Sequence, residues 1–286
     1  MKKFAILALG ILAAAPSFAQ KHSLEQVPQV PVSMRTKAPM PTHAVVDIDH
    51  RPETPANLNN TPSADHVQVR ELVVERQVIG LTQYDLQSNA AIDDRMAGNE
   101  SAVSATWTMS LDVSPFADRG TGYNFFDGNA WGEQPYERLE NVRIGWPSVN
   151  HLGDGREVVI SHAGIDTPLH MVRRDAGTGT WEDSDLPNNA TLEDGTTVGN
   201  LWPRAAVGGI NDEIIHVICI STPIANGGAE YQGQDGCLLY YRSLDSGDTW
   251  EMSTFPELDT THFINMSADA YAIHADGGTV AFAVFN

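Results

Sequence analysis

Residues 238–250, LLYYRSLDSGDTW, decide how the rest of the chain is interpreted. The segment 238–242 is apolar and aromatic, which is typical of a β-strand. Asp245 can accept backbone N–H groups of the turn that follows, and Gly247 can adopt a positive φ without a steric penalty. Trp250 offers a large apolar surface that anchors the returning chain. The stretch therefore predicts two antiparallel strands joined by a tight turn.

A repeat extends this pattern along the chain. Trp146 and Trp202 lie 56 residues apart, and each is followed by proline. Eleven residues after each tryptophan comes a glutamate, Glu157 or Glu213, that opens an apolar strand. Each unit reads as strand a, a turn, strand b, a loop, strand c, a turn and strand d. This is the pattern of a four-stranded β-propeller blade.

The repeat predicts an all-β chain that forms a partial β-propeller of about three and a half blades. Blades begin near residues 91, 146, 202 and 268, within a propeller segment 71–286. Residues 73–86 are rich in β-formers and precede the first strand a, so we expect them to close a last blade. The partners of that strand are absent from the sequence, and we therefore expect a truncated reading frame.

The strongest turn resembles a known motif. Its pattern matches the Asp-box of sialidase-like β-propellers at Ser243, Asp245, Gly247, Thr249 and Trp250. Degenerate copies are expected at Asp118 and Gly120, and at Asp175, Gly177, Thr180 and Trp181. Segments 79–89 and 119–124 resemble secreted members of this group that are exported by the type IX route. The resemblance implies that Asp-box residues are structural and lie opposite the ligand-binding face.

The resemblance also implies a possible chemistry. Enzymes of this family hold a substrate carboxylate with three arginines and use a Tyr–Glu nucleophile pair and an Asp acid/base. Arg143, in Val142-Arg143-Ile144-Gly145-Trp146-Pro147, is the nearest match to the first arginine. Because Trp-Pro recurs at residue 202, the stretch is better explained as the start of a blade.

Two functions follow from this reading. We expect a binding or adhesion module for an uncharacterised ligand. The alternative is a glycoside hydrolase of the sialidase type whose catalytic residues lie mostly in the absent C-terminal part. Fold alone does not separate the two, because propellers serve both purposes.

Two loops are expected at the ligand-binding face, because loops on rigid scaffolds often carry function. The first carries His162 and Asp166, and the second, residues 221–236, carries Glu230, Tyr231 and Asp235. The alternative for both loops is a solvated, variable surface. Together with His170, the first loop has only a loose metal-ligand spacing, so we expect no metal and no cofactor.

The N-terminus predicts export. Residues 1–19 contain two lysines, the apolar run 4–15 and a cleavage site after Ala19, as in a signal peptide. The run is too short to span a bilayer comfortably, so we expect a secreted or surface protein without an integral membrane segment. Residues 20–70 are proline-rich and are expected to be disordered.

The net charge of −20 disfavours nucleic acid and anionic lipid as partners. Glycans or surface proteins remain as partners, and we expect a monomer. The chain has two cysteines, Cys219 in an apolar strand and Cys237 at the start of the next. In an antiparallel pair they could face each other, so a disulfide and two free thiols are both open alternatives.

Overall fold

The structure is a computed structural model that describes residues 77–87, 94–99, 101–164, 167–187, 190–268 and 270–285. All of them belong to one compact unit, residues 75–286. The predicted signal peptide, the proline-rich segment, Asp166 and the blade start near residue 91 lie outside the described residues. Within the described part, no helix has the length and apolarity needed to cross a bilayer.

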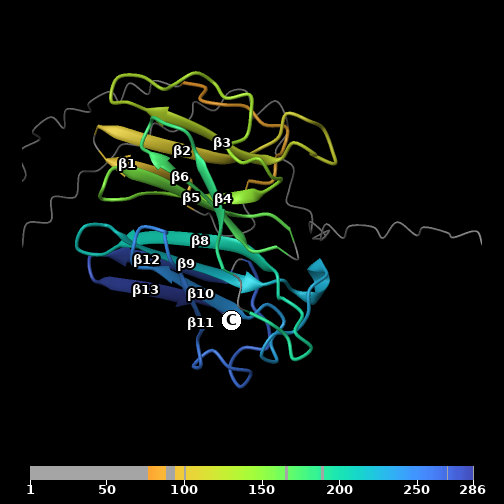
Figure 1. Cartoon of the computed structure of the whole chain (residues 1–286). Coiled ribbons are helices and arrows are strands. Elements are labelled where there is room, and N and C mark those ends of the chain that lie inside the picture. The colour runs from red at the N-terminus through yellow and green to blue at the C-terminus, as the bar shows by residue number, and fades with distance from the viewer. Residues whose placement is uncertain are drawn as a thin grey trace, which may run out of the picture. The chain divides into compact units, whose positions relative to one another are not determined.

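The described chain forms antiparallel sheets and one short 3-10 helix, η1 (Ile224–Asn226) (Figure 1). The first sheet consists of β1 (Met96–Asn99), β2 (Ala102–Met109) and β3 (Gly120–Phe126). The second consists of β4 (Gly145–His151), β5 (Arg156–His162), β6 (Leu169–Asp175) and β7 (Glu182–Asp185). The third consists of β8 (Asn200–Gly208), β9 (Ile214–Ser221), β10 (Leu238–Ser243) and β11 (Glu251–Thr254). The fourth is the hairpin of β12 (Tyr271–Asp276) and β13 (Thr279–Val284).

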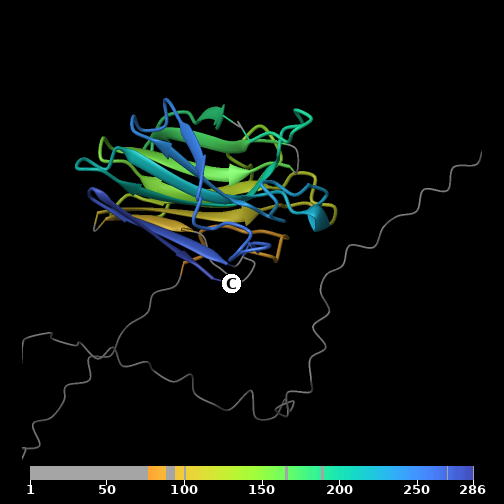
Figure 2. The ribbon, with the colours of Figure 1, turned by 90° about the horizontal axis from the view of Figure 1, so that it is seen from below.

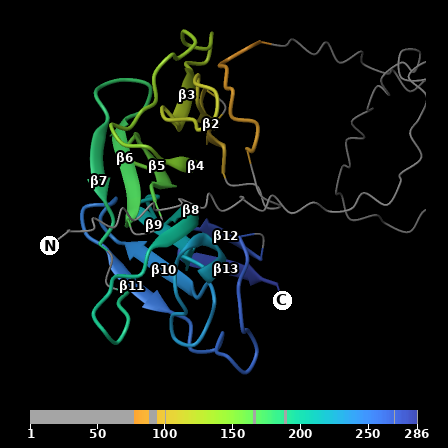
Figure 3. The same cartoon turned by 90° about the vertical axis from the view of Figure 1, so that its right-hand side faces the viewer.

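The sheets follow one another in chain order, with the second between the first and the third (Figures 1 and 3). Their first strands contact in turn: β1 packs on β4, β4 on β8, and β8 on β12. Figure 2 shows the same sheets from below. Successive antiparallel sheets that meet through their first strands are the blades of a β-propeller. The predicted all-β partial propeller is thus confirmed, and we call the four sheets blades 1 to 4.

The two strongest repeats share an irregularity at the start of strand a. The ladder shifts between Gly145 and Ser148 in β4 and between Leu201 and Arg204 in β8. The tryptophan inside each bulge is left-handed, with φ of 54° at Trp146 and 53° at Trp202. A non-glycine residue rarely adopts this conformation, so the surrounding structure must hold it in place.

Apolar packing between blades accounts for the apolar sequences of the central strands. In β5 and β9 nearly every residue is buried on both faces of the sheet. Their apolar runs, which include Val158, Ile160 and Ile218, have no exposure at all. Each such side chain contributes about 1.5–3 kcal/mol to the free energy of unfolding.

The segment before blade 1 differs from the expectation. Residues 77–86 form no strand in the structure. Instead, the Gln83 N–H donates to the carbonyl of Ser110 at 2.6 Å, and the Gln87 amide donates to the carbonyl of Thr108 at 2.9 Å. The described residues 77–87 therefore lie against the end of β2 in blade 1, and the expectation that segment 73–86 closes a last blade stays a prediction.

Candidate functional site

The blades have two different ends. We call the end where β2, β5 and β9 finish and β4, β8 and β12 begin the mouth face. The opposite end, which carries the turns between strands a and b and between strands c and d, is the turn face. The predicted structural and ligand-binding residues divide between these two ends.

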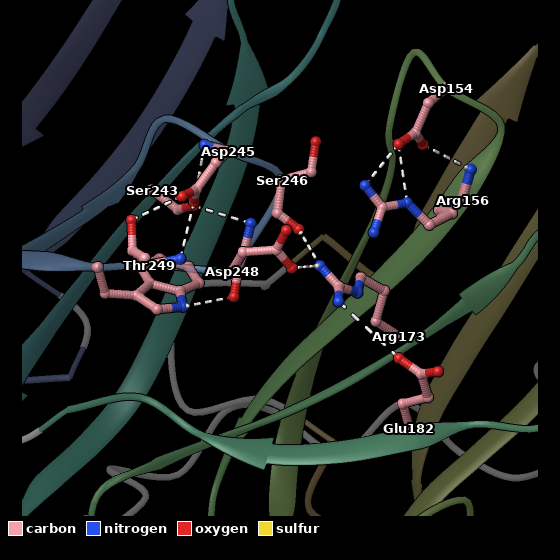
Figure 4. A network of polar contacts seen from close by, with 11 residues as sticks. Asp154, Arg156, Arg173, Glu182, Ser243, Asp245, Ser246, Asp248 and Thr249 are labelled. Carbon is pink, nitrogen blue, oxygen red and sulfur yellow. Dashed lines mark hydrogen bonds and ion pairs between the residues drawn. The ribbon is translucent and has the colours of Figure 1, made fainter.

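The turn that opened the sequence analysis lies on the turn face, between β10 and β11 (Figure 4). The Asp245 carboxylate accepts the Thr249 backbone N–H at 2.8 Å and the Thr249 hydroxyl at 2.6 Å. Ser243 Oγ donates to the same carboxylate at 2.8 Å. Gly247 has φ of 96°, and its carbonyl accepts the indole N–H of Trp250 at 3.1 Å. These five residues close the turn on itself.

The same turn also joins two blades. Arg173, on β6 of blade 2, donates through Nη1 to the Ser246 carbonyl at 2.7 Å and to Asp248 Oδ1 at 2.8 Å (Figure 4). Glu182 lies 3.8 Å from the other side of the guanidinium. The turn is therefore positioned as a connector between blades.

The two degenerate copies behave differently. Asp175 ends β6, and Gly177, Thr180 and Trp181 follow it on the turn that leads to β7, where Gly177 has φ of 69°. Asp118 and Gly120 do not lie on such a turn, because β3 begins at Gly120. The Asp118 carboxylate instead accepts the backbone N–H of Leu111 at 2.6 Å and the hydroxyl of Ser110, on the mouth face.

The turn after β3 begins at Asp127, seven residues after Gly120. The copy expected at Asp118 and Gly120 therefore lies further along the chain. Asp127 Oδ1 accepts the N–H groups of Asn129 and Ala130 at 2.9 Å each. Trp131 then makes an isolated bridge with Phe126. In the sequence, the glycines at 120 and 122 match the pattern of a turn, but in the structure they belong to β3.

Among the described residues of the first predicted ligand loop and its neighbourhood, His162 and His170 do not form a cluster. His162 ends β5, whereas the imidazole of His170 contacts carboxylate oxygens of Asp183 and Asp185 at 2.9 Å each. The two histidines thus contact different groups. Across the described residues, no three His, Cys, Asp or Glu side chains are grouped as metal ligands.

The second predicted loop is largely occupied by its own contacts. Asp235 Oδ1 accepts the Ile224 N–H at 2.8 Å, at the start of η1. Tyr231 packs against the core between blades 2 and 3. Glu230 is exposed to solvent. The arrangement indicates a self-supporting loop in which Asp235 and Tyr231 have structural roles.

A buried arginine that the sequence analysis did not select lies at the mouth face. Arg119 is only 8% exposed, and its guanidinium lies 5.1 Å from the ring centre of Trp146 and 5.4 Å from that of Tyr84. Its Nε donates to the carbonyl of Ile144 at 2.9 Å. Among the described residues, no carboxylate forms an ion pair with it. Burial, together with the nearby charge of Arg143, lowers the pKa of Arg119.

Arg143, the predicted candidate, is exposed beside this site. Its Nε donates to the Phe116 carbonyl at 3.0 Å, and it adds a second positive charge next to Arg119. The structure thus brings the predicted arginine together with a buried one. No sequence motif marks Arg119, because its aromatic neighbours are far from it in the chain.

His162 completes this group and stays neutral. Its ring stacks on Trp146 at 5.0 Å with an interplanar angle of 15°. Nδ1 accepts the backbone N–H of Trp202 at 3.1 Å, so the ring proton is on Nε2. Burial, with the charges of Arg119, Arg143 and Arg95, lowers the pKa of His162 to about 3. Among the described residues of this group, the positive charge therefore comes from the arginines and not from His162.

Both cysteines are free and buried in the structure. Cys219 lies opposite Leu239, so Cys237 is its diagonal neighbour and does not face it directly. Diagonal residues of an antiparallel pair are about 7–8 Å apart, whereas disulfides need Cα atoms about 4.4–6.8 Å apart. The expected facing pair is wrong in register, and of the two open alternatives the structure has free thiols. Burial raises the pKa of the Cys237 thiol to about 11.

No protein-family model matches the sequence, and the search of curated proteins finds no match. Solved structures do align. The phage phi92 endosialidase aligns with a TM-score of 0.37 and 10% identity over 63% of this chain and 28% of that chain. A Penicillium chrysogenum α-L-arabinanase complexed with arabinobiose aligns with a TM-score of 0.37 and 13% identity over 67% of this chain and 56% of that chain. A Dyadobacter fermentans protein of unknown function aligns with a TM-score of 0.42 and 12% identity over 66% of this chain and 61% of that chain.

This chain therefore spans less than two thirds of the length of each of these three structures. Since the three TM-scores lie below 0.5, the fold assignment rests on the strand order and the contacts between blades described above.

Proposed function

We propose that this chain is part of a β-propeller that binds the acidic group of a carbohydrate at its mouth face. The observation that carries the proposal is Arg119, a buried cation with no carboxylate partner among the described residues. A buried charge is costly unless it is paired, so a ligand anion would relieve that cost. The planar guanidinium suits a carboxylate, which it can bind through two parallel hydrogen bonds.

The surroundings favour a sugar as the carrier of that anion. Tyr84 and Trp146 flank the guanidinium, and Arg143 lies at its rim. Flat apolar rings with a few fixed polar groups are the usual composition of a small-molecule site. The net charge of −20 repels anions in general, so the local arginines would select ligands that reach this place.

A glycoside hydrolase of the sialidase type is the second candidate. Three carboxyl groups line one cavity at the mouth face, and the pKa values of two of them shift in opposite directions, upward for Glu140 and downward for Asp118. Such a divergence is typical of acid/base pairs in glycosidases. However, both oxygens of Asp118 accept hydrogen bonds from residues 110–112, which favours binding over catalysis.

The test is direct binding of the full chain to N-acetylneuraminic, galacturonic and glucuronic acids, with galactose as the neutral comparison. Arg119→Met should weaken binding of the acidic sugar by at least about tenfold, the loss of one charged contact. Arg156→Met is the matched control, because Arg156 pairs with Asp154 on the turn face. No binding to any acidic sugar, or equal binding by both variants, would overturn the proposal. Release of a fluorogenic sialoside would favour the hydrolase instead.

We also propose that the protein is exported, on the strength of the leader sequence in residues 1–19. N-terminal sequencing of the mature protein tests this, with Gln20 as the expected first residue. A mature chain that retains Met1 would contradict it.

A further inference from the structure

A cavity of about 360 Å³ lies on the mouth face of blade 1, beside Arg119. Its lining consists of Met109, Asp118, Tyr136, Glu137, Arg138 and Glu140. The volume is within the range of about 300–1,000 Å³ that is typical of small-ligand sites. None of these residues belongs to the arginine site proposed above.

The cavity is tied to the arginine site through the backbone. Arg138 Nη1 donates to the carbonyl of Arg119 at 3.2 Å, while its Nε donates to the carbonyl of Glu140 at 3.0 Å. The third donor of the group, Nη2, contacts the Asn141 carbonyl at 3.2 Å. Arg138 thus holds the loop in shape against the backbone of Arg119, and Asp118, the neighbour of Arg119 in the chain, lines the cavity.

One wall of the cavity holds a polar atom without a partner. Glu140 is 3% exposed, and its Oε2 accepts the Thr121 N–H at 3.0 Å. Its Oε1 has no hydrogen-bond partner in the part of the chain that the structure describes. Because buried polar atoms are normally satisfied, this oxygen is a candidate acceptor for a ligand hydroxyl.

An exposed aromatic ring stands at the edge of the same cavity. Tyr136 is 72% exposed, although tyrosine usually buries much of its ring. A second anion is disfavoured there, since Asp118, Glu137 and Glu140 all carry carboxyl groups. An uncharged ring with hydroxyl donors fits both features.

We propose that this cavity holds a neutral sugar unit linked to the acidic unit bound at Arg119. Tyr136 packs against the face of the sugar ring, and Glu140 accepts one of its hydroxyl groups. The inference rests on the proposed function and deepens it, because it assigns an oligosaccharide as the ligand in place of a single acidic sugar.

The experiment compares a free acidic sugar with an oligosaccharide that contains it. The probes are N-acetylneuraminic acid with 3′-sialyllactose, galacturonic acid with trigalacturonic acid, and glucuronic acid with a hyaluronan tetrasaccharide. Affinities are measured by calorimetry on the full chain and on Tyr136→Ala and Glu140→Gln. Leu111→Ala, an exposed residue on the same face outside the cavity, is the control.

The oligosaccharide should bind about tenfold more tightly than its free acid, and Tyr136→Ala should remove most of that gain while the free acid binds as before. Glu140→Gln should reduce the gain as well, and thermal melting checks that it is folded. If the free acid binds but Tyr136→Ala leaves the gain unchanged, this inference fails and the proposed function stands. If no acid binds, both fail. Calcium-dependent binding that Glu137→Gln removes would mark the cavity as a cation site and would also overturn the inference.

Discussion

Arg119, which is buried, and Arg174, whose side chain is 13% exposed, have similar aromatic surroundings and differ in one partner. Arg174 lies 4.7 Å from the ring centre of Tyr123 and 4.4 Å from that of Trp181, as Arg119 lies between Tyr84 and Trp146. Arg174 Nε donates to Glu157, a carboxylate with no exposure, at 2.8 Å.

The site around Glu157 is complete within the protein. Tyr123 OH donates to Glu157 at 2.9 Å and Ser104 Oγ at 2.6 Å, so the buried carboxylate is fully surrounded by donors. Arg119 has the aromatic rings but no such carboxylate in the described chain. An aromatic sandwich alone therefore does not show whether an arginine is structural, whereas the presence of its counter-charge does.

The largest loss of stability is expected from breaking the ion pair between Glu157 and Arg174. Glu157→Gln leaves Arg174 buried and uncompensated, and should lower the free energy of unfolding by about 3–5 kcal/mol. Urea unfolding measures it. Adding Arg174→Met should restore part of the loss, because the unpaired charge is then removed. If the double variant is no more stable than Glu157→Gln alone, the loss does not come from the uncompensated charge of Arg174.

A smaller effect on stability is expected at Arg119. Arg119→Met should change the free energy of unfolding by no more than about 1 kcal/mol, because it removes a charge that has no carboxylate partner among the described residues. The same urea experiment gives the value. A loss as large as that of Glu157→Gln would mean that Arg119 is structural, and the contrast between the two arginines would disappear.

The connector turn on the turn face should contribute a modest amount. Asp245→Ala removes the acceptor of two Thr249 hydrogen bonds and should cost about 1–2 kcal/mol. Those bonds lower the pKa of Asp245, so its contribution is present above the ordinary carboxyl pKa and is lost as pH falls through the lowered one. Unfolding measured at pH 7 and pH 3 should therefore show a smaller difference between variant and parent at the lower pH. An equal difference at both values would contradict the role of the charge.

The smallest effect is expected at the cysteines. Because both thiols are buried and the pKa of Cys237 is raised to about 11, neither should react with a thiol reagent at pH 8 in the folded protein. Both should react in denaturant. Added reductant should leave the melting temperature unchanged. A melting temperature that falls with reductant would show a disulfide.

The blades could be predicted from the sequence because the repeated features are short patterns of residues. Trp146 and Trp202 each lie in strand a of a blade, as their repeat predicts, and the turn at Asp245 is closed by residues 243–250, so short patterns were enough to place both features. The strand pairing at Cys219 was less accessible, since its register depends on where the intervening loop ends.

The arginine site could not be read from any one stretch. Tyr84, Arg119 and Trp146 come from three separate segments that meet only when blades 1 and 2 pack. The copy expected at Asp118 failed for a related reason: glycines at 120 and 122 admit close neighbours inside a strand as well as turns. A Cβ at Gly122 would lie 2.2 Å from the Trp107 ring, which explains the glycine without a turn.

The left-handed tryptophans have a consequence for how such a chain can grow. The Trp146 N–H donates to Thr108 at the end of β2, and the Trp202 N–H donates to His162 at the end of β5. Each of these contacts therefore needs only the end of strand b in one blade and the start of strand a in the next. A gene segment that encodes one such unit carries half of each adjoining contact, so its duplication would extend the series without redesigning the contacts already made.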